Sequence, residues 1–310
     1  MMPKRNKIAV VGAGHVGESC ALFSATKELG DVVLIDIMED MPKGKALDIL
    51  EGSPVGGFDV SVTGGGSAAS LSGADVVIIT AGSARKPGMS RDDLLNVNAK
   101  IVGSVAEDIK KYALDAFVIV VTNPLDVMAW LVKETTGFDR RRIVGMAGAL
   151  DSARFRAFIA MELDVSVKDV HALVLGGHGD GMVPLVRCAS VSGVPISSLM
   201  EKSTIDRLVE RTRKAGGEIV GLLGDGSAYV SPAASAVMMA EAYLKDQKRV
   251  MGASACLQGE YGIEDIYLGV PVKLSGRGLE EIIEIDLSRE ERAMLVASAE
   301  EVRKQIDLIR

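Results

Sequence analysis

The chain has 310 residues, 48% of them hydrophobic and 25% charged, an ordinary balance for a folded protein long enough for two domains. Its net charge of −7 argues against nucleic acid or a membrane surface as a general partner, because both attract basic faces. Only 4% of the residues are aromatic, which argues against a stacking surface for sugars or bases. An anionic small molecule would therefore need local cationic groups.

The N-terminal residues lead at once into a strand pattern, and no cleavable signal is recognisable after them. No apolar run approaches the ~20 residues of a membrane span. The three cysteines, Cys20, Cys188 and Cys256, are odd in number and far apart, as expected of reduced thiols. We therefore expect a cytoplasmic protein.

The first half of the chain alternates short apolar runs with helical segments. Strands are predicted at 7–14, 32–37, 59–64, 75–82, 117–124 and 142–148, and helices at 15–29, 41–51, 91–113 and 125–136. The strands lack polar alternation and are joined through helices, which indicates a parallel sheet buried on both faces. We expect a doubly wound α/β domain, a Rossmann fold, over residues 1–145.

The pattern changes after residue 145. Helices are predicted at 150–163, 203–221 and 227–245, and the glycine-punctuated stretch 251–285 resembles an antiparallel sheet. A last helix begins with a capping box formed by Ser288 and Glu291. We expect residues 146–310 to form a second, mixed α+β domain that binds the substrate.

The first strand pattern is followed by GAGHVG, which supplies Gly12, Gly14 and Gly17 at the start of a helix. Such glycines permit a tight turn, close approach of a pyrophosphate and close helix–strand packing. Asp36, 19 positions after Gly17, ends the next predicted strand, where a carboxylate binds ribose hydroxyls and repels the 2′-phosphate of NADP. The motif predicts an NAD site, although glycines can also serve only a turn and a strand-end aspartate only a helix cap.

Cationic groups and one histidine mark a second site. Arg85 and Arg91 share a loop rich in glycine, proline and serine, Arg154 stands three residues after Asp151, and His178 lies in GGHGD. Guanidinium groups bind carboxylates with two hydrogen bonds, and imidazole transfers protons near neutral pH. The combination indicates a small dianion handled beside a redox cofactor, although a solvated loop and a surface arginine are the plainer alternatives.

At this point the chain resembles the lactate/malate dehydrogenase superfamily over nearly its full length. Within it, the chain is most similar to the lactate-dehydrogenase-like, NAD-dependent malate dehydrogenases. The matching strings, in the family's order, are GAGHVG, TAGSARKPGMSRDDLL, VTNPLDVM, GMAGALDSARFR, GGHGDGMVPL and GSAYVSPAASA.

The resemblance implies reversible hydride transfer between malate and NAD, with oxaloacetate and NADH as products. His178 is then the general acid–base, and Asp151 orients its imidazole and stabilises the charged form. Arg154 binds the C1 carboxylate, and Arg91, on a mobile loop, polarises the reacting carbonyl. Asn123 contacts the substrate oxygen, and the cofactor-binding set is Gly12, Gly14, Gly17, Asp36, Asn98 and Asn123.

Arg85 is the specificity residue by the same resemblance, because lactate dehydrogenases have glutamine at the matching place. An arginine there pairs with the second carboxylate of oxaloacetate, and pyruvate would leave that charge unpaired. Gly181 and Ala228 depart from the threonines usual in family members, which suggests a looser turn and a roomier pocket; Ser231 also falls among the pocket positions.

Other readings remain open. The nearest alternative is a lactate or other 2-hydroxy-acid dehydrogenase, and a distant one is an NAD-binding protein without catalysis. His171 is expected to be a packed core histidine, and His15 is assigned no chemistry. We expect no metal and, from the resemblance, a homodimer or homotetramer.

Overall fold

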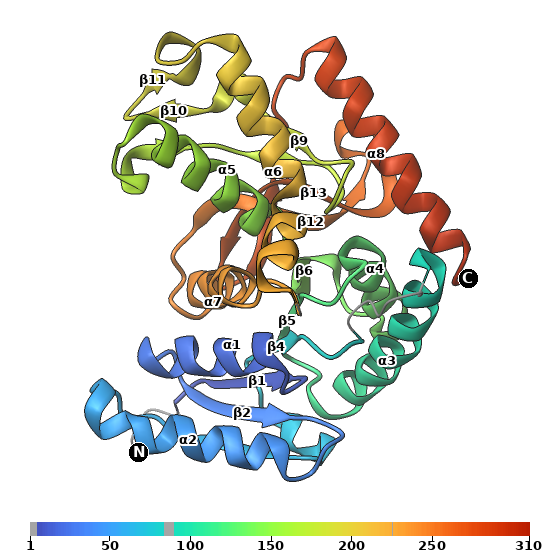
Figure 1. The fold of residues 1–310 in the computed structure, drawn as a ribbon. Helices are drawn as coiled ribbons and strands as arrows, with labels where there is room; N and C mark the ends of the chain where they lie inside the picture. Colours follow the sequence, from blue (N-terminus) through green and yellow to red (C-terminus); the bar gives the residue numbers. More distant parts are fainter. Residues whose placement is uncertain (1–4, 84–89, 225) are drawn as a thin grey trace.

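The computed structural model describes residues 5–83, 90–224 and 226–310 (Figure 1). Arg85, the predicted specificity residue, lies outside the described residues.

A parallel sheet forms the first half of the molecule, as the sequence predicts. Its strands lie in the order β3-β2-β1-β4-β5-β6, and each neighbouring pair is parallel. The bounds are β1 Lys7–Val11, β2 Asp31–Ile35, β3 Val62–Gly65, β4 Val76–Ile79, β5 Phe117–Val120 and β6 Ile143–Gly145. The order reverses beside β1, so the carboxyl ends of β1 and β4 open the crevice where doubly wound sheets bind ligands.

The helices of this half cover the sheet on both faces. They are α1 His15–Thr26, α2 Met41–Gly56, α3 Arg91–Tyr112 and α4 Leu125–Thr136. α1 packs on β1 and β2, α2 packs on β2 and β3, and the two helices contact each other, whereas α3 and α4 pack together. All four residues of β4 are fully buried, which explains why the strand sequences show no polar alternation. Between β3 and β4 the chain forms only a short 3₁₀ turn, Ala68–Leu71.

The second half combines helices with antiparallel strands. Its helices are α5 Ala147–Leu163, α6 Lys202–Leu223, α7 Val230–Leu244 and α8 Arg289–Asp307. Its strands are β7 Val170–His171, β8 Val174–Leu175, β9 Val183–Pro184, β10 Ser190–Val191, β11 Val194–Pro195, β12 Arg249–Gln258, β13 Glu264–Ser275 and β14 Gly278–Ile282. The predicted antiparallel arrangement of β12, β13 and β14 and the predicted capping box of α8 are both confirmed.

The antiparallel strands continue the parallel sheet. β12 pairs with β6 at Ser254 and Gly145, which gives a single sheet of nine described strands in the order β14-β13-β12-β6-β5-β4-β1-β2-β3. The sequence pattern did not predict this continuation. It places α5, which follows β6 directly, beside β12 and at the edge where the parallel strands end.

His171 corrects one expectation. It was predicted to be packed in the core, but it is exposed on β7, while its neighbour Val170 is fully buried. β7 belongs to a small three-stranded sheet with β10 and β11, and alternate residues of such a strand face opposite sides. Over the described residues, no helix combines the length and apolar character needed to cross a membrane.

Candidate active site

The glycine turn between β1 and α1 is shaped by close backbone contacts. Gly12 has φ of +100°, and a Cβ on it would lie 2.4 Å from the backbone nitrogen of Ala81. A Cβ on Gly17 would lie 1.8 Å from the carbonyl oxygen of Gly12. Gly14 differs, because no described atom lies within 4 Å of where its Cβ would be, and no described side chain caps the first turn of α1. The open face and uncapped amides fit a pyrophosphate.

Asp36 follows the last residue of β2 and accepts two backbone hydrogen bonds. Its Oδ2 accepts from the amide of Ala13 at 2.7 Å, and its Oδ1 accepts from the amide of Met38 at 3.1 Å. The carboxylate therefore holds the glycine turn to the end of β2. It stays partly exposed beside that turn, where the adenosine end of a dinucleotide would lie.

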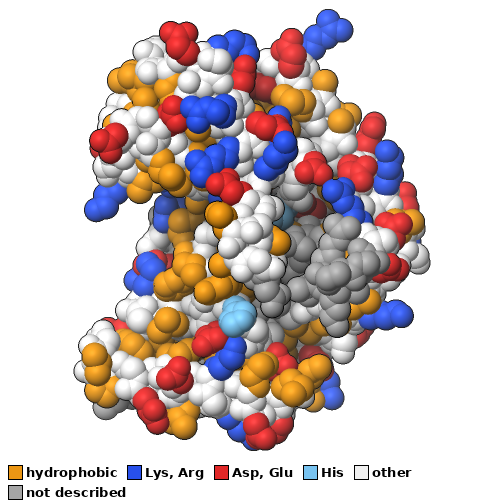
Figure 2. Space-filling view, viewed as in Figure 1, with side chains coloured by type: hydrophobic (Ala, Val, Ile, Leu, Met, Phe, Trp, Pro, Cys, Tyr) orange, Lys and Arg blue, Asp and Glu red, His pale blue; other side chains and the backbone are white. Residues whose placement is uncertain are grey.

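A cleft of about 490 Å³ runs from this turn to the predicted catalytic residues. Its walls come from the glycine turn, from the ends of β4 and β5, from α5, and from the segment joining α6 to α7. Figure 2 shows the surface hollowed between the lower and upper parts of the molecule. Of the predicted residues, Gly14, Gly17, Asn98, Asn123, Arg154, His178 and Ala228 line it, and Ser231 is not among the described residues that do.

The predicted acid–base residues are in contact. His178 Nδ1 lies 3.0 Å from Asp151 Oδ2, and Arg154 Nη1 lies 3.6 Å from Asp151 Oδ1. Asp151 and Arg154 stand three residues apart on α5 and therefore share one face of the helix. The side chains of His178, Asp151 and Arg154 are 16%, 3% and 11% exposed, so His178 is largely buried, although the glycines that flank it in the sequence suggest an exposed turn. On the same loop, a Cβ on Gly177 or Gly181 would meet side chains of α8 at 3.2 or 2.9 Å, so the loop packs closely against that helix.

The pKa of His178 is raised above its ordinary value of 6.5. Burial opposes the charged imidazolium, but the charge and hydrogen bond of Asp151 outweigh it. Arg154 lowers this pKa and Asp126 raises it further. The site therefore favours a protonated imidazole, which can donate its proton to a substrate oxygen.

The guanidinium of Arg154 has a hydrogen-bond donor without a partner among the described residues. Its Nε is buried and has no hydrogen-bond partner among the described residues, and the same holds for Asp151 Oδ1. Burial lowers the pKa of the Arg154 guanidinium, and the charge of Asp151 only partly opposes this. A largely buried cation that lines the cleft fits an anionic ligand such as a carboxylate.

Asn98 forms hydrogen bonds to backbone groups beside the cleft. Its buried amide accepts from the amide of Ser83 at 2.7 Å and donates to the carbonyl oxygen of Asn123 at 2.7 Å. It therefore joins the segments that follow β4 and β5. Asn123 is exposed and lines both the cleft and a second pocket.

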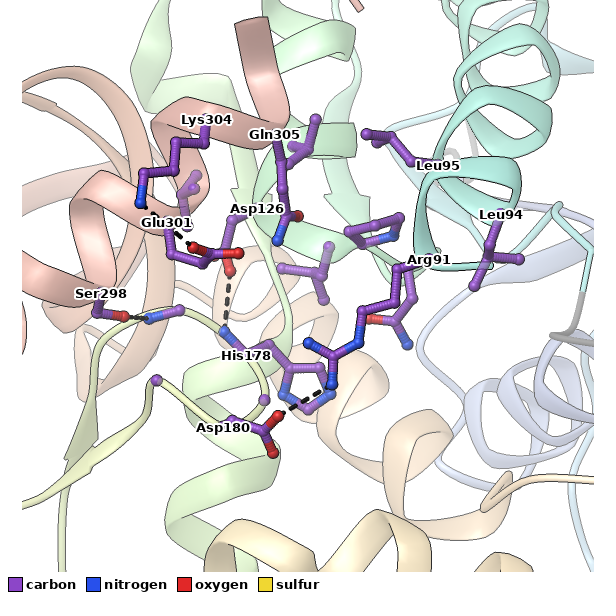
Figure 3. Close-up of a pocket in the computed structure, with 18 of the residues that line it drawn as sticks. Arg91, Leu94, Leu95, Asp126, His178, Asp180, Ser298, Glu301, Lys304 and Gln305 are labelled. Carbon is purple, nitrogen blue, oxygen red and sulfur yellow. Dashed lines mark hydrogen bonds and ion pairs between the residues drawn. The ribbon is translucent and has the colours of Figure 1, made fainter. Parts of the chain in front are cut away.

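Arg91 lines a different pocket from Arg154. It begins α3 and pairs with Asp180 at 3.0 Å, and both side chains are largely exposed. It lines a second pocket of about 400 Å³, between α3, α8 and the loop that carries His178, and is not among the described residues that line the cleft (Figure 3). The structure therefore brings His178, Asp151 and Arg154 into contact, and it places Arg91 with His178 and Asn123 in the second pocket.

Two further residues anchor the loop of His178 and were not singled out from the sequence. The amide of Gly177 donates to Ser298 Oγ at 2.8 Å, and the amide of His178 donates to Asp126 Oδ2 at 2.9 Å (Figure 3). Asp126 is the acid of VTNPLDVM, within the first turn of α4, so its place in a matching string was the available signal. A Cβ on Gly181 would lie 2.9 Å from Ser298 Oγ, so the bare Gly181 packs against α8.

Comparison of the chain with known protein families identifies its relatives. A model described as the lactate/malate dehydrogenase NAD binding domain matches residues 6–145. A model for the alpha/beta C-terminal domain of the same family matches residues 148–310. The chain belongs to the lactate/malate dehydrogenase family. The family, the fold class and NAD as cofactor, all predicted from the sequence strings, are thereby confirmed.

Relatives and solved structures match over nearly full length. The chain is 55% identical to a malate dehydrogenase of Bacillus pumilus, covering 100% of both chains, and 56% identical to one of Geobacter sulfurreducens, covering 99% of both. Malate dehydrogenase from Salinibacter ruber has a TM-score of 0.94 and 49% identity, covering 98% of this chain and 97% of that one. Lactate dehydrogenase from Cryptosporidium parvum, complexed with lactic acid and NAD, has a TM-score of 0.96 and 46% identity, covering 99% and 98%.

Proposed function

We propose that the protein is an NAD-dependent malate dehydrogenase, which interconverts (S)-malate and oxaloacetate. The observation that carries the proposal is the buried contact of His178 with Asp151 beside the unsatisfied Arg154, in a cleft that reaches the glycine turn. Full-length relatives named malate dehydrogenase support the same substrate.

In the proposed reaction the cofactor transfers the hydride and His178 transfers the proton. When bound, the nicotinamide cofactor supplies or accepts the hydride. In oxaloacetate reduction, protonated His178 donates its Nε2 proton to the carbonyl oxygen as that oxygen becomes a hydroxyl, and in malate oxidation neutral His178 takes the proton back. Asp151 holds Nδ1 and stabilises the imidazolium, so the protonated form persists to higher pH than in a free imidazole.

The substrate is held by cationic and amide groups. Arg154 binds the carboxylate next to the reacting carbon, using its unpaired Nε. Arg91 exchanges Asp180 for the substrate carbonyl; an exposed ion pair contributes little stability, so this exchange costs little. Arg85 binds the second carboxylate, and Asn123 contacts the substrate oxygen from the end of β5.

The cofactor site is proposed from the same structure. Gly14 leaves the space that the pyrophosphate would occupy, and Asp36 lies where the adenosine ribose would follow. Asn98 supports the cofactor mainly through the backbone segments that it joins.

NADH oxidation with separate keto acids tests the proposal. We expect fast absorbance loss with oxaloacetate and slow loss with pyruvate or 2-oxoisocaproate at neutral pH. Arg85→Gln should lower the rate with oxaloacetate and raise the relative rate with pyruvate. A native preference for pyruvate would assign the protein to lactate, the second candidate, which the likeness to lactate dehydrogenase structures keeps in view. No turnover with any of the three would contradict a dehydrogenase function.

Three expectations about the whole protein belong to the same proposal. We propose a boundary between the cofactor-binding and substrate-binding domains near residue 145, a homodimer or homotetramer, and a cytoplasmic location. Exposed apolar side chains on α1 and α2, such as Leu22 and Leu47, give an assembly a surface to bury. The mass in solution, measured by light scattering, would refute the assembly if it matched a single chain.

A further inference from the structure

The loop of His178 is fixed by three successive amides that bond to three different elements. Gly176 donates to the carbonyl of Gly269 on β13 at 2.9 Å, and Gly177 donates to Ser298 Oγ on α8 at 2.8 Å. His178 donates to Asp126 Oδ2 on α4 at 2.9 Å. Of these three acceptors, only Asp126 can carry a charge.

Asp126 is buried, being only 5% exposed, and both of its oxygens are engaged. Oδ2 accepts from the His178 amide, and Oδ1 lies 2.5 Å from Ser254 Oγ, whose hydroxyl donates to it. Its place in the first turn of α4 adds the favourable field of a helix N-terminus for an anion. The pKa of this carboxyl is raised, because burial and the charge of Asp151 are only partly opposed by the donors from Ser254 and His178 and by the charge of His178.

The charges around His178 can be named for each packed element. From α5 come Asp151, which contacts the ring, and Arg154, which opposes its protonation. From α4 comes Asp126, and from β12 the neutral Ser254. From α3 comes Arg91, which pairs at 3.0 Å with Asp180 of the His178 loop. From α8, Glu301 and Lys304 form their own pair at 4.0 Å at the rim of the second pocket (Figure 3). Arg154 therefore offsets part of the negative charge that Asp151 presents to the imidazolium. Asp126 supplies a second buried carboxylate near the same ring.

We propose that Asp126 is a positioning residue for His178, which fixes the backbone of the acid–base and supplies the second negative charge that stabilises its imidazolium. This role rests on the proposed acid–base function of His178. Asp126 is not among the described residues that line the cleft, and it holds His178 by the backbone amide rather than by the imidazole ring. Asp151 fixes the orientation of the imidazole ring, whereas Asp126 fixes the position of the His178 backbone and raises the proton affinity of the ring.

Two variants separate charge from geometry. Asp126→Asn keeps an acceptor for the His178 amide but removes the charge, and Asp126→Ala removes both. Ser298→Ala is the matched control, because it removes the neutral acceptor of the neighbouring amide and leaves all charges in place. Circular dichroism and thermal unfolding confirm that each variant is folded before it is compared.

The first readout is the proton affinity of His178, measured by NMR of the imidazole protons. The chain has only three histidines, so His178→Gln assigns the signal. We expect Asp126→Asn to lower the midpoint by roughly 0.5–1 pH unit and Ser298→Ala to leave it unchanged. An unchanged midpoint in Asp126→Asn would refute the electrostatic part of the proposal, whether or not the protein turns over malate.

The second readout is the pH profile of oxaloacetate reduction, which needs protonated His178. In Asp126→Asn the alkaline fall should begin at lower pH, with less than tenfold loss of kcat below the fall. In Asp126→Ala kcat should drop by roughly tenfold more, because the His178 amide also loses its acceptor. Equal kcat in the two variants would refute the backbone role. An inactive native protein would instead contradict the proposed function, while the NMR result would still stand.

Discussion

Gly17 and Gly14 belong to one motif, yet the structure predicts different outcomes when each becomes alanine. A Cβ at position 17 would lie 1.8 Å from the carbonyl oxygen of Gly12, whereas ordinary contacts begin near 3.4 Å. The two atoms must therefore separate by about 1.6 Å, and backbone must move, because no flexible side chain is involved. Overpacking of this severity should cost about 3 kcal/mol of unfolding free energy and lower the Tm by roughly 5–10 °C.

Gly14→Ala meets no described atom within 4 Å and keeps an extended backbone, so the unfolding free energy should fall by less than about 1 kcal/mol. Its methyl group would instead occupy the space assigned to the pyrophosphate. We expect the Kd for NADH to rise about tenfold, equivalent to about 1.4 kcal/mol. Urea denaturation and NADH fluorescence titration measure both quantities. Normal NADH affinity in Gly14→Ala would refute the placement of the pyrophosphate, and normal stability in Gly17→Ala would refute the steric argument.

Three further outcomes follow from the site. Asp151→Asn should lower the pKa of His178, so the alkaline fall of oxaloacetate reduction moves to lower pH; a pH profile like that of the native protein would contradict the raised pKa. Because folding raises the pKa of His178, the stability that this residue contributes should be fully present below pH 6.5 and should decline as pH rises through the folded pKa. The urea midpoints of His178→Gln should lack that decline. Arg154→Lys should raise KM for oxaloacetate by roughly 10–100-fold, since a single ammonium cannot form the two-pronged bond, while NADH titration stays unchanged; an unaffected KM would place the carboxylate elsewhere.

The sequence predicted the parallel half of the fold well because its signals are local. Runs such as the one that forms β4 are buried on both faces, and glycines and capping residues mark where helices begin. Asp36 was expected at the end of its strand and lies one residue beyond β2. His178, Asp151 and Arg154 were predicted from residue type and matching strings, and the structure places them in contact.

What the sequence missed depends on contacts between distant segments. Ser298 and Asp126 are 121 and 52 residues from the loop amides that they hold, and no periodicity reveals such pairs. The burial of His178 has the same origin, because glycine flanks suggest exposure unless a helix packs on them. His171 was misplaced for a related reason: a two-residue strand gives too little alternation to show which side faces solvent.

The joint between β6 and β12 gives Ser254 two tasks. It is the residue of β12 paired with Gly145, and its hydroxyl holds Asp126. A Cβ on Gly145 would lie 2.7 Å from that of Ser254, so the two strands meet without room for a side chain. Ser254, Asp126 and the His178 amide are thereby linked by contacts to the pairing of β6 with β12, so a change of sheet twist at this joint would be passed to the His178 loop. The joint between β6 and β12 therefore also helps to position the proton donor. A substitution far from the cleft that alters the twist of the sheet should change kcat before it measurably lowers the unfolding free energy.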